Sequence, residues 1–243
     1  GRNMKTIKQK LLVSFLALVT AAALICGGVG IAFNYTNAKS LLQQTLTAAS
    51  YVSAERVSYE LASYRNAIAA LGMDAALTDE TISDAEKGEI VSTWVEYYGM
   101  ERGNLLDTNG DSVMDGNNYS DRDYFQRALK GEVFVSTPII SKVTGQLSIM
   151  IAAPVWKDGI EGGEIAGVVY FVPRETFLND IMSSIKVSAN SGAYMIDSTG
   201  VTIADTTLDT VSVENIEEEA KNDPSLETLA SMHADMRAGN TGY

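Results

Sequence analysis

A long apolar run near the N-terminus constrains the fold of this chain more than any other feature. Leu11 to Phe33 carry no charged side chain, and about 20 consecutive apolar residues suffice to cross a bilayer as a helix. Lys5, Lys8 and Lys10 precede the run, and basic residues keep their side of a membrane helix in the cytoplasm. The pattern predicts a helix that anchors the chain in the cell membrane.

Two alternatives to an uncleaved anchor remain open. A cleaved signal peptide has a shorter apolar region that ends in small residues. A lipoprotein signal would use Cys26, but Ile25 stands where a small residue is expected, and the apolar run continues past the cysteine. We favour the anchor, with a cytoplasmic N-terminus (residues 1–10), a transmembrane helix (11–33) and an extracytoplasmic remainder (34–243).

The charge of the remainder excludes some functions. The chain has a net charge of -13, and every charge before Asn34 is positive, so the part outside the membrane is strongly acidic. Such a surface repels nucleic acid, and we expect no nucleic-acid partner. A single cysteine and a single histidine exclude a disulfide framework and a His/Cys zinc site. We expect no cofactor.

The segment after the apolar run predicts a long stalk helix over residues 34–72. It contains no proline and no glycine before Gly72. Five apolar side chains recur in it at intervals of four and three residues, namely Val57, Leu61, Tyr64, Ile68 and Leu71. This stripe could form a dimer stalk, pack along its own domain, or do each in turn, and we expect a homodimer.

Thr81 to Tyr98 predict a second helix, whose apolar face comprises Ile90, Val91, Trp94, Val95 and Tyr98. The remaining predicted elements follow in order: a helix from near Asp121 to Gly131, strands over 133–140, 148–156 and 164–172, and helices over 175–185, 213–221 and 224–237. The first of these helices is expected to begin with a capping box of Ser120 and Asp123. Turns are expected at Thr144–Gly145 and over 157–163.

An internal repeat is the clearest sign of domain organisation. LDTNGDSVMD, from Leu106, matches IDSTGVTIAD, from Ile196, at an offset of 90 residues. Each copy predicts a strand, a tight turn at glycine and a second strand. Two such hairpins indicate two related α+β modules in tandem, a membrane-distal one (73–186) and an incomplete membrane-proximal one (187–243).

The first copy also has spacing that suggests a calcium loop, with Asp107, Asn109, Asp111 and Asp115 as oxygen ligands. However, Ser112 stands where such a loop needs glycine, and the second copy lacks the additional oxygen ligands. We therefore expect no metal.

Arg122 lies in the sequence beside Tyr119, Tyr124 and Phe125. A guanidinium next to aromatic rings, presented by a short helix against a sheet, is suited to bind a small anionic or zwitterionic ligand. The alternative is a surface helix whose Tyr124 and Phe125 only pack inward.

The order of these features resembles the double Cache (dCache) sensor domains of bacterial methyl-accepting chemotaxis receptors. The resemblance rests on the D-x-x-G turn at Asp107, SDRDYFQRALKG, STPIISKVTGQ, GVVYFVPRETFLNDI and the second turn at Asp197. It implies an α+β fold with an N-terminal transmembrane helix, a stalk helix and two tandem PAS-like modules with antiparallel sheets, the second truncated. It also implies a second transmembrane helix, a HAMP linker and a signalling coiled coil after Tyr243.

The resemblance extends to the ligand site. In the amino-acid-sensing branch an Arg-x-Trp-Tyr run holds the ligand carboxylate, and an aspartate on the last strand of the module holds the amine. Arg122 matches the arginine and Tyr124 could replace the tryptophan, whereas Phe125 lacks a hydroxyl and Val172 replaces the aspartate. The ammonium of an α-amino acid would therefore lack its counter-charge.

A carboxylate ligand, or one whose cation meets Asp121 or Asp123, remains open. The expected ligand-binding residues are Tyr119, Asp121, Arg122, Asp123, Tyr124, Phe125, Ser136 and Tyr170. The expected ligand is a small carboxylate, amine or amino-acid-like molecule.

We expect a sensor that signals across the membrane for chemotaxis, and not an enzyme. His233 is the only histidine and no G-x-S-x-G motif occurs, so a nucleophile with its base is hard to assemble. The input domain of a histidine kinase or of a cyclic-dinucleotide enzyme is the first alternative, and an extracellular lipoprotein, adhesin or hydrolase the second.

Overall fold

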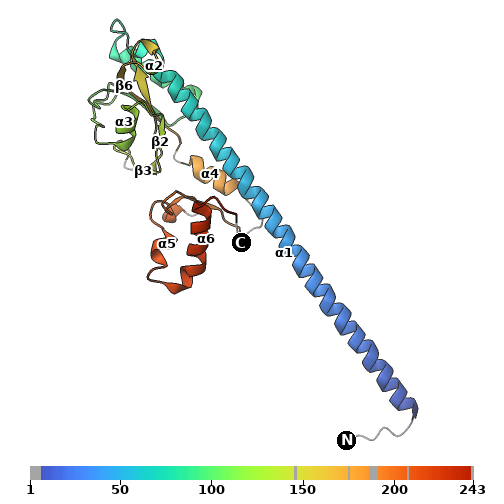
Figure 1. The fold of residues 1–243 in the computed structure, drawn as a ribbon. Coiled ribbons are helices and arrows are strands. Elements are labelled where there is room, and N and C mark those ends of the chain that lie inside the picture. Colours follow the sequence, from blue (N-terminus) through green and yellow to red (C-terminus); the bar gives the residue numbers. More distant parts are fainter. Residues whose placement is uncertain (1–6, 145–146, 175, 186–190, 207, 242–243) are drawn as a thin grey trace. The chain divides into compact units, whose positions relative to one another are not determined.

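The computed structural model describes residues 7–144, 147–174, 176–185, 191–206 and 208–241 (Figure 1). The chain divides into two compact units, Gly1–Ala49 and Ser50–Tyr243. The boundary falls within the first helix, α1 (Ile7–Gly72), which is uninterrupted over 66 residues. The predicted continuation of the apolar helix into the stalk helix is therefore confirmed.

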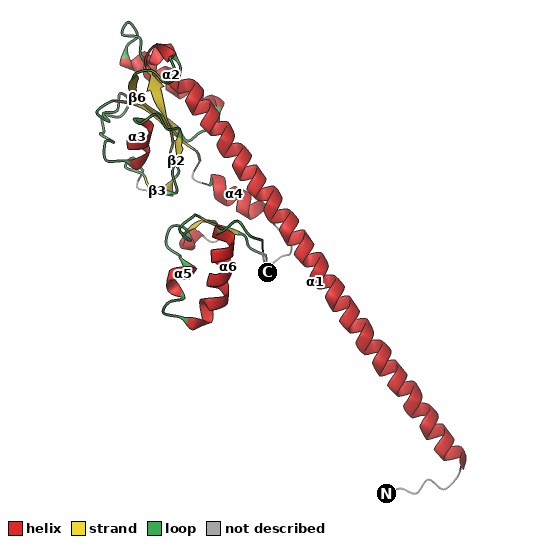
Figure 2. Ribbon diagram, viewed as in Figure 1, coloured by secondary structure: helices red, strands yellow, loops and turns green. Residues whose placement is uncertain are grey.

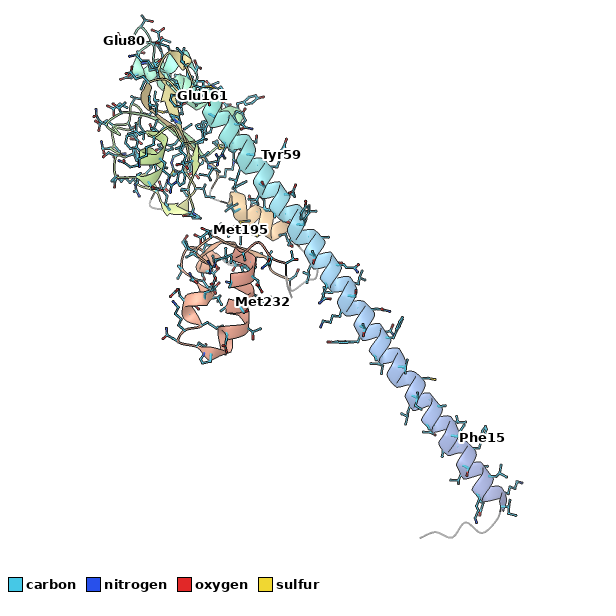
Figure 3. All side chains as sticks on the ribbon, viewed as in Figure 1. Phe15, Tyr59, Glu80, Glu161, Met195 and Met232 are labelled. Carbon is cyan, nitrogen blue, oxygen red and sulfur yellow. The ribbon has the colours of Figure 1, made fainter. Side chains whose placement is uncertain are left out.

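The first unit is the N-terminal part of α1. It is long and apolar enough to cross a membrane, and none of its most apolar window is buried within the protein. Large apolar side chains such as Leu11, Phe15 and Leu24 are exposed there, and Figure 3 shows Phe15 on this part of the helix. Exposed apolar surface of this size is favourable only outside water, which supports the predicted membrane span.

The second unit is built on a four-stranded antiparallel sheet (Figure 2). Its order is β1 (Arg102–Asp107), β6 (Ile165–Val172), β5 (Ile151–Trp156) and β2 (Phe134–Val135). The six residues from Gly167 to Val172 are all buried, because both faces of the sheet are covered. Such strands read as continuous runs of β-branched and aromatic residues.

One face of the sheet packs against α1 and α2 (Asp84–Tyr97). Ile68 and Leu71 of α1 and Val91 of α2 are fully buried there. The predicted apolar stripe of the stalk helix thus packs on its own domain at this end. The approach is close, because a Cβ on Gly72 would lie 2.1 Å from the carbonyl oxygen of Pro154.

The opposite face packs against α3 (Asp123–Ala128), which begins differently from the prediction. Arg122 occupies the N-cap position, and no side chain caps the helix. The capping box with Ser120 was wrong, because the Ser120 hydroxyl donates to Asn118 Oδ1 at 2.6 Å instead. The capping box that does form belongs to α2, where Ser83 and Glu86 bond each other's backbone N–H groups.

The predicted strand over 133–140 was also wrong, because Pro138 divides it. Proline has no N–H to donate to a strand partner. β2 pairs with β5, whereas β3 (Ile139–Ile140) pairs with β4 (Leu147–Ser148) in a separate two-stranded sheet. Of the predicted turn between them, Gly145 lies outside the described residues.

The two copies of the internal repeat share a turn but differ in their strands. Asp107 Oδ1 accepts from the N–H groups of Asn109 and Asp111, as Asp197 Oδ1 does from Thr199 and Val201. The second copy forms the predicted hairpin, β7 (Tyr194–Ile196) with β8 (Thr202–Asp205). The first copy has β1 and the turn, but after the turn only isolated bridges follow, such as that between Leu106 and Ser112, so the prediction of a second strand there was wrong.

Local hydrogen bonds explain the missing strand of the first copy. Ser112 Oγ accepts from the N–H groups of Met114 and Asp115, and Asp115 Oδ1 accepts from that of Asn117. Such side-chain bonds offer the backbone an alternative to a strand ladder. The segment therefore forms a structured loop over the sheet.

Three further helices follow β6: α4 (Phe177–Ser184), α5 (Ile216–Glu219) and α6 (Glu227–Arg237). The predicted Asp223 cap is confirmed, since its carboxylate accepts from the N–H of Ser225. Single turns of 3-10 helix complete the chain at Ala75–Leu77, Lys157–Gly159, Leu208–Thr210 and Pro224–Leu226. The division into two tandem modules, the second incomplete, stays a prediction.

Candidate ligand seat on the α3 face of the sheet

Three tyrosines form the centre of the candidate site. Tyr170 projects from β6 towards α3, Tyr124 lies on α3, and Tyr119 precedes it on the loop. The rings of Tyr119 and Tyr124 meet the Tyr170 ring edge to face, with centroids 5.9 and 5.3 Å apart. This is the preferred geometry of aromatic pairs, and all three side chains are buried.

A hydrogen-bond network ties the loop to β1. Asp115 Oδ2 accepts from the Tyr119 hydroxyl at 2.6 Å and from Asn104 Nδ2 at 2.9 Å. Asn104 Nδ2 also donates to the Tyr170 hydroxyl at 3.3 Å, and Ser112 Oγ donates to Asn104 Oδ1 at 2.8 Å. The network fixes the tyrosines against the sheet.

The residues of the network differ in protonation state. Burial raises the pKa of Tyr119, Tyr124 and Tyr170, so all three are neutral at ordinary pH. Burial alone would also raise the pKa of Asp115, but hydrogen bonds, with that from Tyr119 the largest, hold it below its usual value. Asp115 is therefore an ionised acceptor within the network.

Arg122 is a cation without a partner in the described part of the chain. Its backbone starts α3, and its guanidinium makes no hydrogen bond or ion pair with any described residue. Arg122 is the N-cap of the helix that carries Tyr124, and its positive charge opposes the rise that burial causes in the pKa of Tyr124. A guanidinium of this kind can bind an anionic group of a ligand.

Lys142 is a second cation at the rim. Its ammonium group bonds the Asp121 carboxylate and the Asn118 carbonyl, and it lies 5.8 Å from the centroid of the Tyr119 ring. Asp121 is thus already paired with a cation. Asp123 is paired as well, with Arg127 on the exposed side of α3 at 3.0 Å.

Arg102 is a further cation beside the seat, which was not predicted from the sequence. It is the first residue of β1, and its side chain is only 18% exposed. Its Nη1 atom pairs with Glu101 at 2.7 Å and its Nη2 atom donates to Ser141 Oγ at 2.8 Å, but its buried Nε has no partner among the described residues. Alternation along the strand, which puts Arg102 on the same face as Asn104, could have identified it.

The predicted site residues take different places. Tyr119, Tyr124, Phe125 and Tyr170 lie in one buried cluster, and Arg122 lies beside them. Ser136 has a backbone role instead, since its hydroxyl oxygen accepts from the N–H of Met150 at 2.9 Å. Asp121 and Asp123 are at the surface, each in an ion pair.

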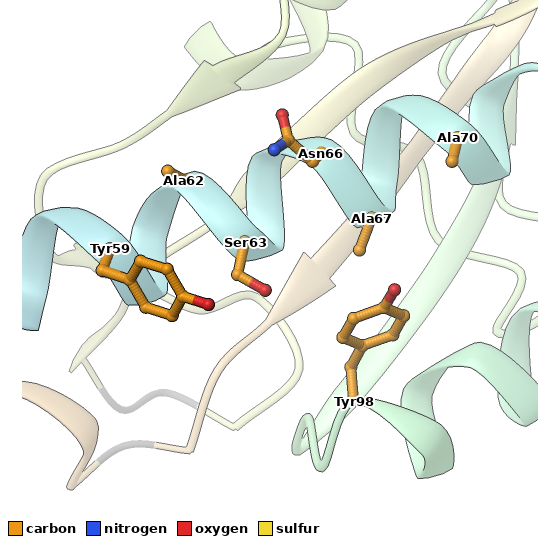
Figure 4. Close-up of a pocket in the computed structure, with 7 residues that line it drawn as sticks. All are labelled: Tyr59, Ala62, Ser63, Asn66, Ala67, Ala70 and Tyr98. Carbon is orange, nitrogen blue, oxygen red and sulfur yellow. The ribbon is translucent and has the colours of Figure 1, made fainter.

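Two hollows lie away from this seat, on the surface of α1 and α2. One, of 310 Å³, is lined by Tyr98 and by residues of α1, among them Tyr59, Asn66 and Ala70 (Figure 4). The other, of 250 Å³, is lined by Thr93, Trp94, Tyr97 and Tyr98. Within the described ranges, no group of three or more His, Cys, Asp or Glu side chains is arranged to hold a metal ion.

The comparisons with known proteins identify the family. A family model of the Cache domain (dCache_1) matches residues 34–242. The chain belongs to the Cache domain family. This family is sensory and binds ligands rather than catalysing reactions. No curated protein matches the chain.

Solved structures share the Cache fold. The ligand-binding domain of the Campylobacter jejuni chemoreceptor Tlp3, in complex with 4-methylisoleucine, has a TM-score of 0.58 at 19% identity, and the match covers 72% of this chain and 75% of that one. The ligand-binding domain of the Pseudomonas aeruginosa PAO1 amino acid chemoreceptor PctC, in complex with GABA, has a TM-score of 0.59 at 17% identity, with coverage of 74% and 82%. The sensor domain of the Vibrio cholerae histidine kinase DctB has a TM-score of 0.52 at 17% identity, with coverage of 70% of each chain.

Proposed function

We propose that this chain is the ligand-binding region of a transmembrane chemoreceptor, which detects a small extracellular molecule and signals across the membrane for chemotaxis. The observation that carries the proposal is the Cache domain on a helix that continues into an apolar segment able to span a bilayer. The chemoreceptor domains among the structural neighbours support this role.

The ligand seat of the proposal is the α3 face of the sheet. Arg122 supplies a guanidinium that has no partner among the residues the structure describes, and Tyr119, Tyr124 and Tyr170 supply aromatic walls with hydroxyl groups. A charge-assisted hydrogen bond from Arg122 to an anionic group would hold the ligand against the rings.

Strand β6 offers a route from this seat to α1. Tyr170 belongs to the cluster on the α3 face, whereas its neighbours Val169 and Phe171 belong to the cluster that contains Ile68 and Leu71 of α1. Because side chains alternate along a strand, a ligand that displaces Tyr170 also shifts the surface on which α1 packs. Binding would thus reach the membrane through the helix itself.

Substitution of Arg122 tests the seat. A thermal-shift screen of small carboxylates, amines and amino acids on the full chain in detergent would find a ligand, and calorimetry would give its affinity. A hydrogen bond to a charged group contributes roughly 1.5–3 kcal/mol, so Arg122→Ala should weaken binding by about ten- to a hundredfold.

Arg65→Ala is the matched control, since Arg65 is exposed on α1 and has no ion pair with a described residue. It should bind the ligand like the unmodified chain. If Arg122→Ala remained folded and kept full affinity, the seat would lie elsewhere.

The input region of a sensor histidine kinase is the second candidate, because the DctB sensor domain shares the fold. Deletion of the gene separates the two. Loss of movement towards the ligand in a capillary assay supports the chemoreceptor, whereas unchanged chemotaxis with altered transcription in response to the ligand supports the kinase.

A further inference from the structure

Resting on the ligand seat proposed above, we infer that Arg102 is a second anion-binding group of that seat. The ligand class that follows is a small dicarboxylate rather than an α-amino acid. Arg102 and Arg122 come from different elements, the first strand of the sheet and the N-cap of α3, and each can hold one carboxylate.

The strand register places Arg102 on the seat face. Arg102 is opposite Val172, and Asn104 is opposite Tyr170. Tyr170 and Val172 both belong to the cluster under α3, and residues opposite each other in an antiparallel pair share a face. Arg102 and Asn104 therefore lie on the same face of the sheet as Tyr170, the face that α3 covers.

Electrostatics place both guanidinium groups near one ring. Burial raises the pKa of Tyr124, and the charges of Arg122 and Arg102 both oppose that rise. Burial likewise raises the pKa of Tyr170, opposed mainly by hydrogen bonds with Asn104 and Tyr119 and to a smaller extent by the charge of Arg102. The strand register places Arg102 on the sheet face that α3 covers, Arg122 is the N-cap of α3, and the charges of both act on Tyr124.

Arg102 also has an unused donor. Its Nε is buried and has no partner among the described residues, while Nη1 and Nη2 bond Glu101 and Ser141. A buried donor of a charged group that lacks an acceptor is destabilising. A carboxylate oxygen of a ligand would satisfy it.

The acidic groups around the seat all have partners. Glu101 pairs with Arg102, and Asp121 pairs with Lys142. Asp115 accepts from Tyr119, Asn104 and the backbone of Asn117. The described seat therefore offers an ammonium group no free carboxylate.

The unpaired charged groups of the described seat are cationic instead. Among the described residues of the seat, the Arg122 guanidinium and the Arg102 Nε are charged-group donors without acceptors, and Val172, which lies opposite Arg102 in the strand pair, is uncharged. An ammonium group beside Arg102 would meet a like charge. Two carboxylates would complement both arginines.

Calorimetry on the full chain in detergent tests the inference with defined probes. Malonate, succinate and glutarate vary the spacing of two carboxylates, propionate has only one, and L-aspartate adds an ammonium group. We expect at least one dicarboxylate to bind at least tenfold more tightly than propionate and L-aspartate.

Three variants assign the second carboxylate to Arg102. Arg102→Gln should weaken the binding of the preferred dicarboxylate at least tenfold and change the affinity for propionate by less than twofold. Arg102→Lys keeps the positive charge but loses the planar guanidinium that can bind a carboxylate through two N–H groups. Its affinity for the dicarboxylate should therefore lie between those of the unmodified chain and Arg102→Gln. Val172→Asp places a carboxylate opposite Arg102 and should remove the preference for two carboxylates, while Arg65→Gln, the matched exposed control, should change nothing.

The outcomes separate this inference from the proposed function. If an amino acid binds more tightly than every dicarboxylate and its binding still depends on Arg122, the inference is wrong and the proposed seat stands. If folded Arg102→Gln binds the dicarboxylate like the unmodified chain, Arg102 is not a ligand-binding group. If no ligand found in the screen depends on Arg122, the proposed seat itself fails.

Discussion

At the scale of single residues, the loop between β1 and α3 holds the seat together. Gly110 and Gly116 both adopt positive φ there, +84° and +73°. They differ in their surroundings, since a Cβ on Gly110 would lie 2.6 Å from the backbone nitrogen of Ser120, whereas one on Gly116 would meet nothing within 4 Å. Substitution of Gly116 therefore tests backbone strain alone, whereas substitution of Gly110 adds a steric clash.

This difference gives a stability prediction. Gly116→Ala should cost about 1–2 kcal/mol, the usual penalty of a left-handed conformation with a side chain. Gly110→Ala should cost clearly more, because the loop backbone at Ser120 must also move. Chemical denaturation of both variants measures the free energies of unfolding. Equal losses would show that the close approach of Gly110 and Ser120 is not a feature of the folded state.

Individual residues also show where sequence reasoning ends. Arg122 and the tyrosines could be chosen from their neighbourhood in the sequence. Arg102 could not be chosen in that way, because Ser141 and Val172, which are distant in the sequence, come next to it only in the folded chain. The predicted capping box of Ser120 does not form, because the Ser120 hydroxyl has a nearer acceptor in Asn118.

At the scale of elements, α1 has two different faces in its C-terminal part. Val57, Ile68 and Leu71 are buried against the protein's own domain. The other face carries Tyr59, which is 78% exposed, beside the hollow formed with Tyr98 (Figure 4). The predicted homodimer would therefore use this second face rather than the apolar stripe.

A charge on that face tests the dimer. Tyr59→Arg should raise the dissociation constant of the dimer at least tenfold, because it removes an apolar contact and places like charges across a two-fold axis. Sedimentation in detergent over a range of concentrations would measure it. Ile160→Arg is the control, since Ile160 is also well exposed but lies on the turn before β6. Unchanged association of Tyr59→Arg would contradict this interface.

Elements with strong periodicity could be predicted, and those divided by local chemistry could not. The helices α1, α2 and α6 and strand β6 lie close to their predicted positions. The segment around Pro138 and the loop after Gly110 differ, because proline and side-chain hydrogen bonds there outweigh the preference of β-branched residues for strands. Both departures lie beside the seat.

At the scale of the whole molecule, the basic residues before Leu11 and the acidic remainder predict that residues 34–243 lie outside the cytoplasm. A reporter enzyme that is active only in the cytoplasm, fused after Gly200, should be inactive. The same reporter fused after Lys10 should be active. Strong activity of the Gly200 fusion would contradict the predicted topology.

Because α1 is continuous, a residue inserted into it changes both its length and the rotation of one end about the helix axis relative to the other. An α-helix turns by about 100° per residue, so a single residue inserted between Asn34 and Ala49 would rotate every earlier side chain by that angle relative to Val57 and Ile68. An insertion of seven residues, nearly two full turns, would restore the phase to within about 20°. If α1 carries the signal as proposed, an insertion of seven residues should therefore disturb the receptor less than an insertion of one residue.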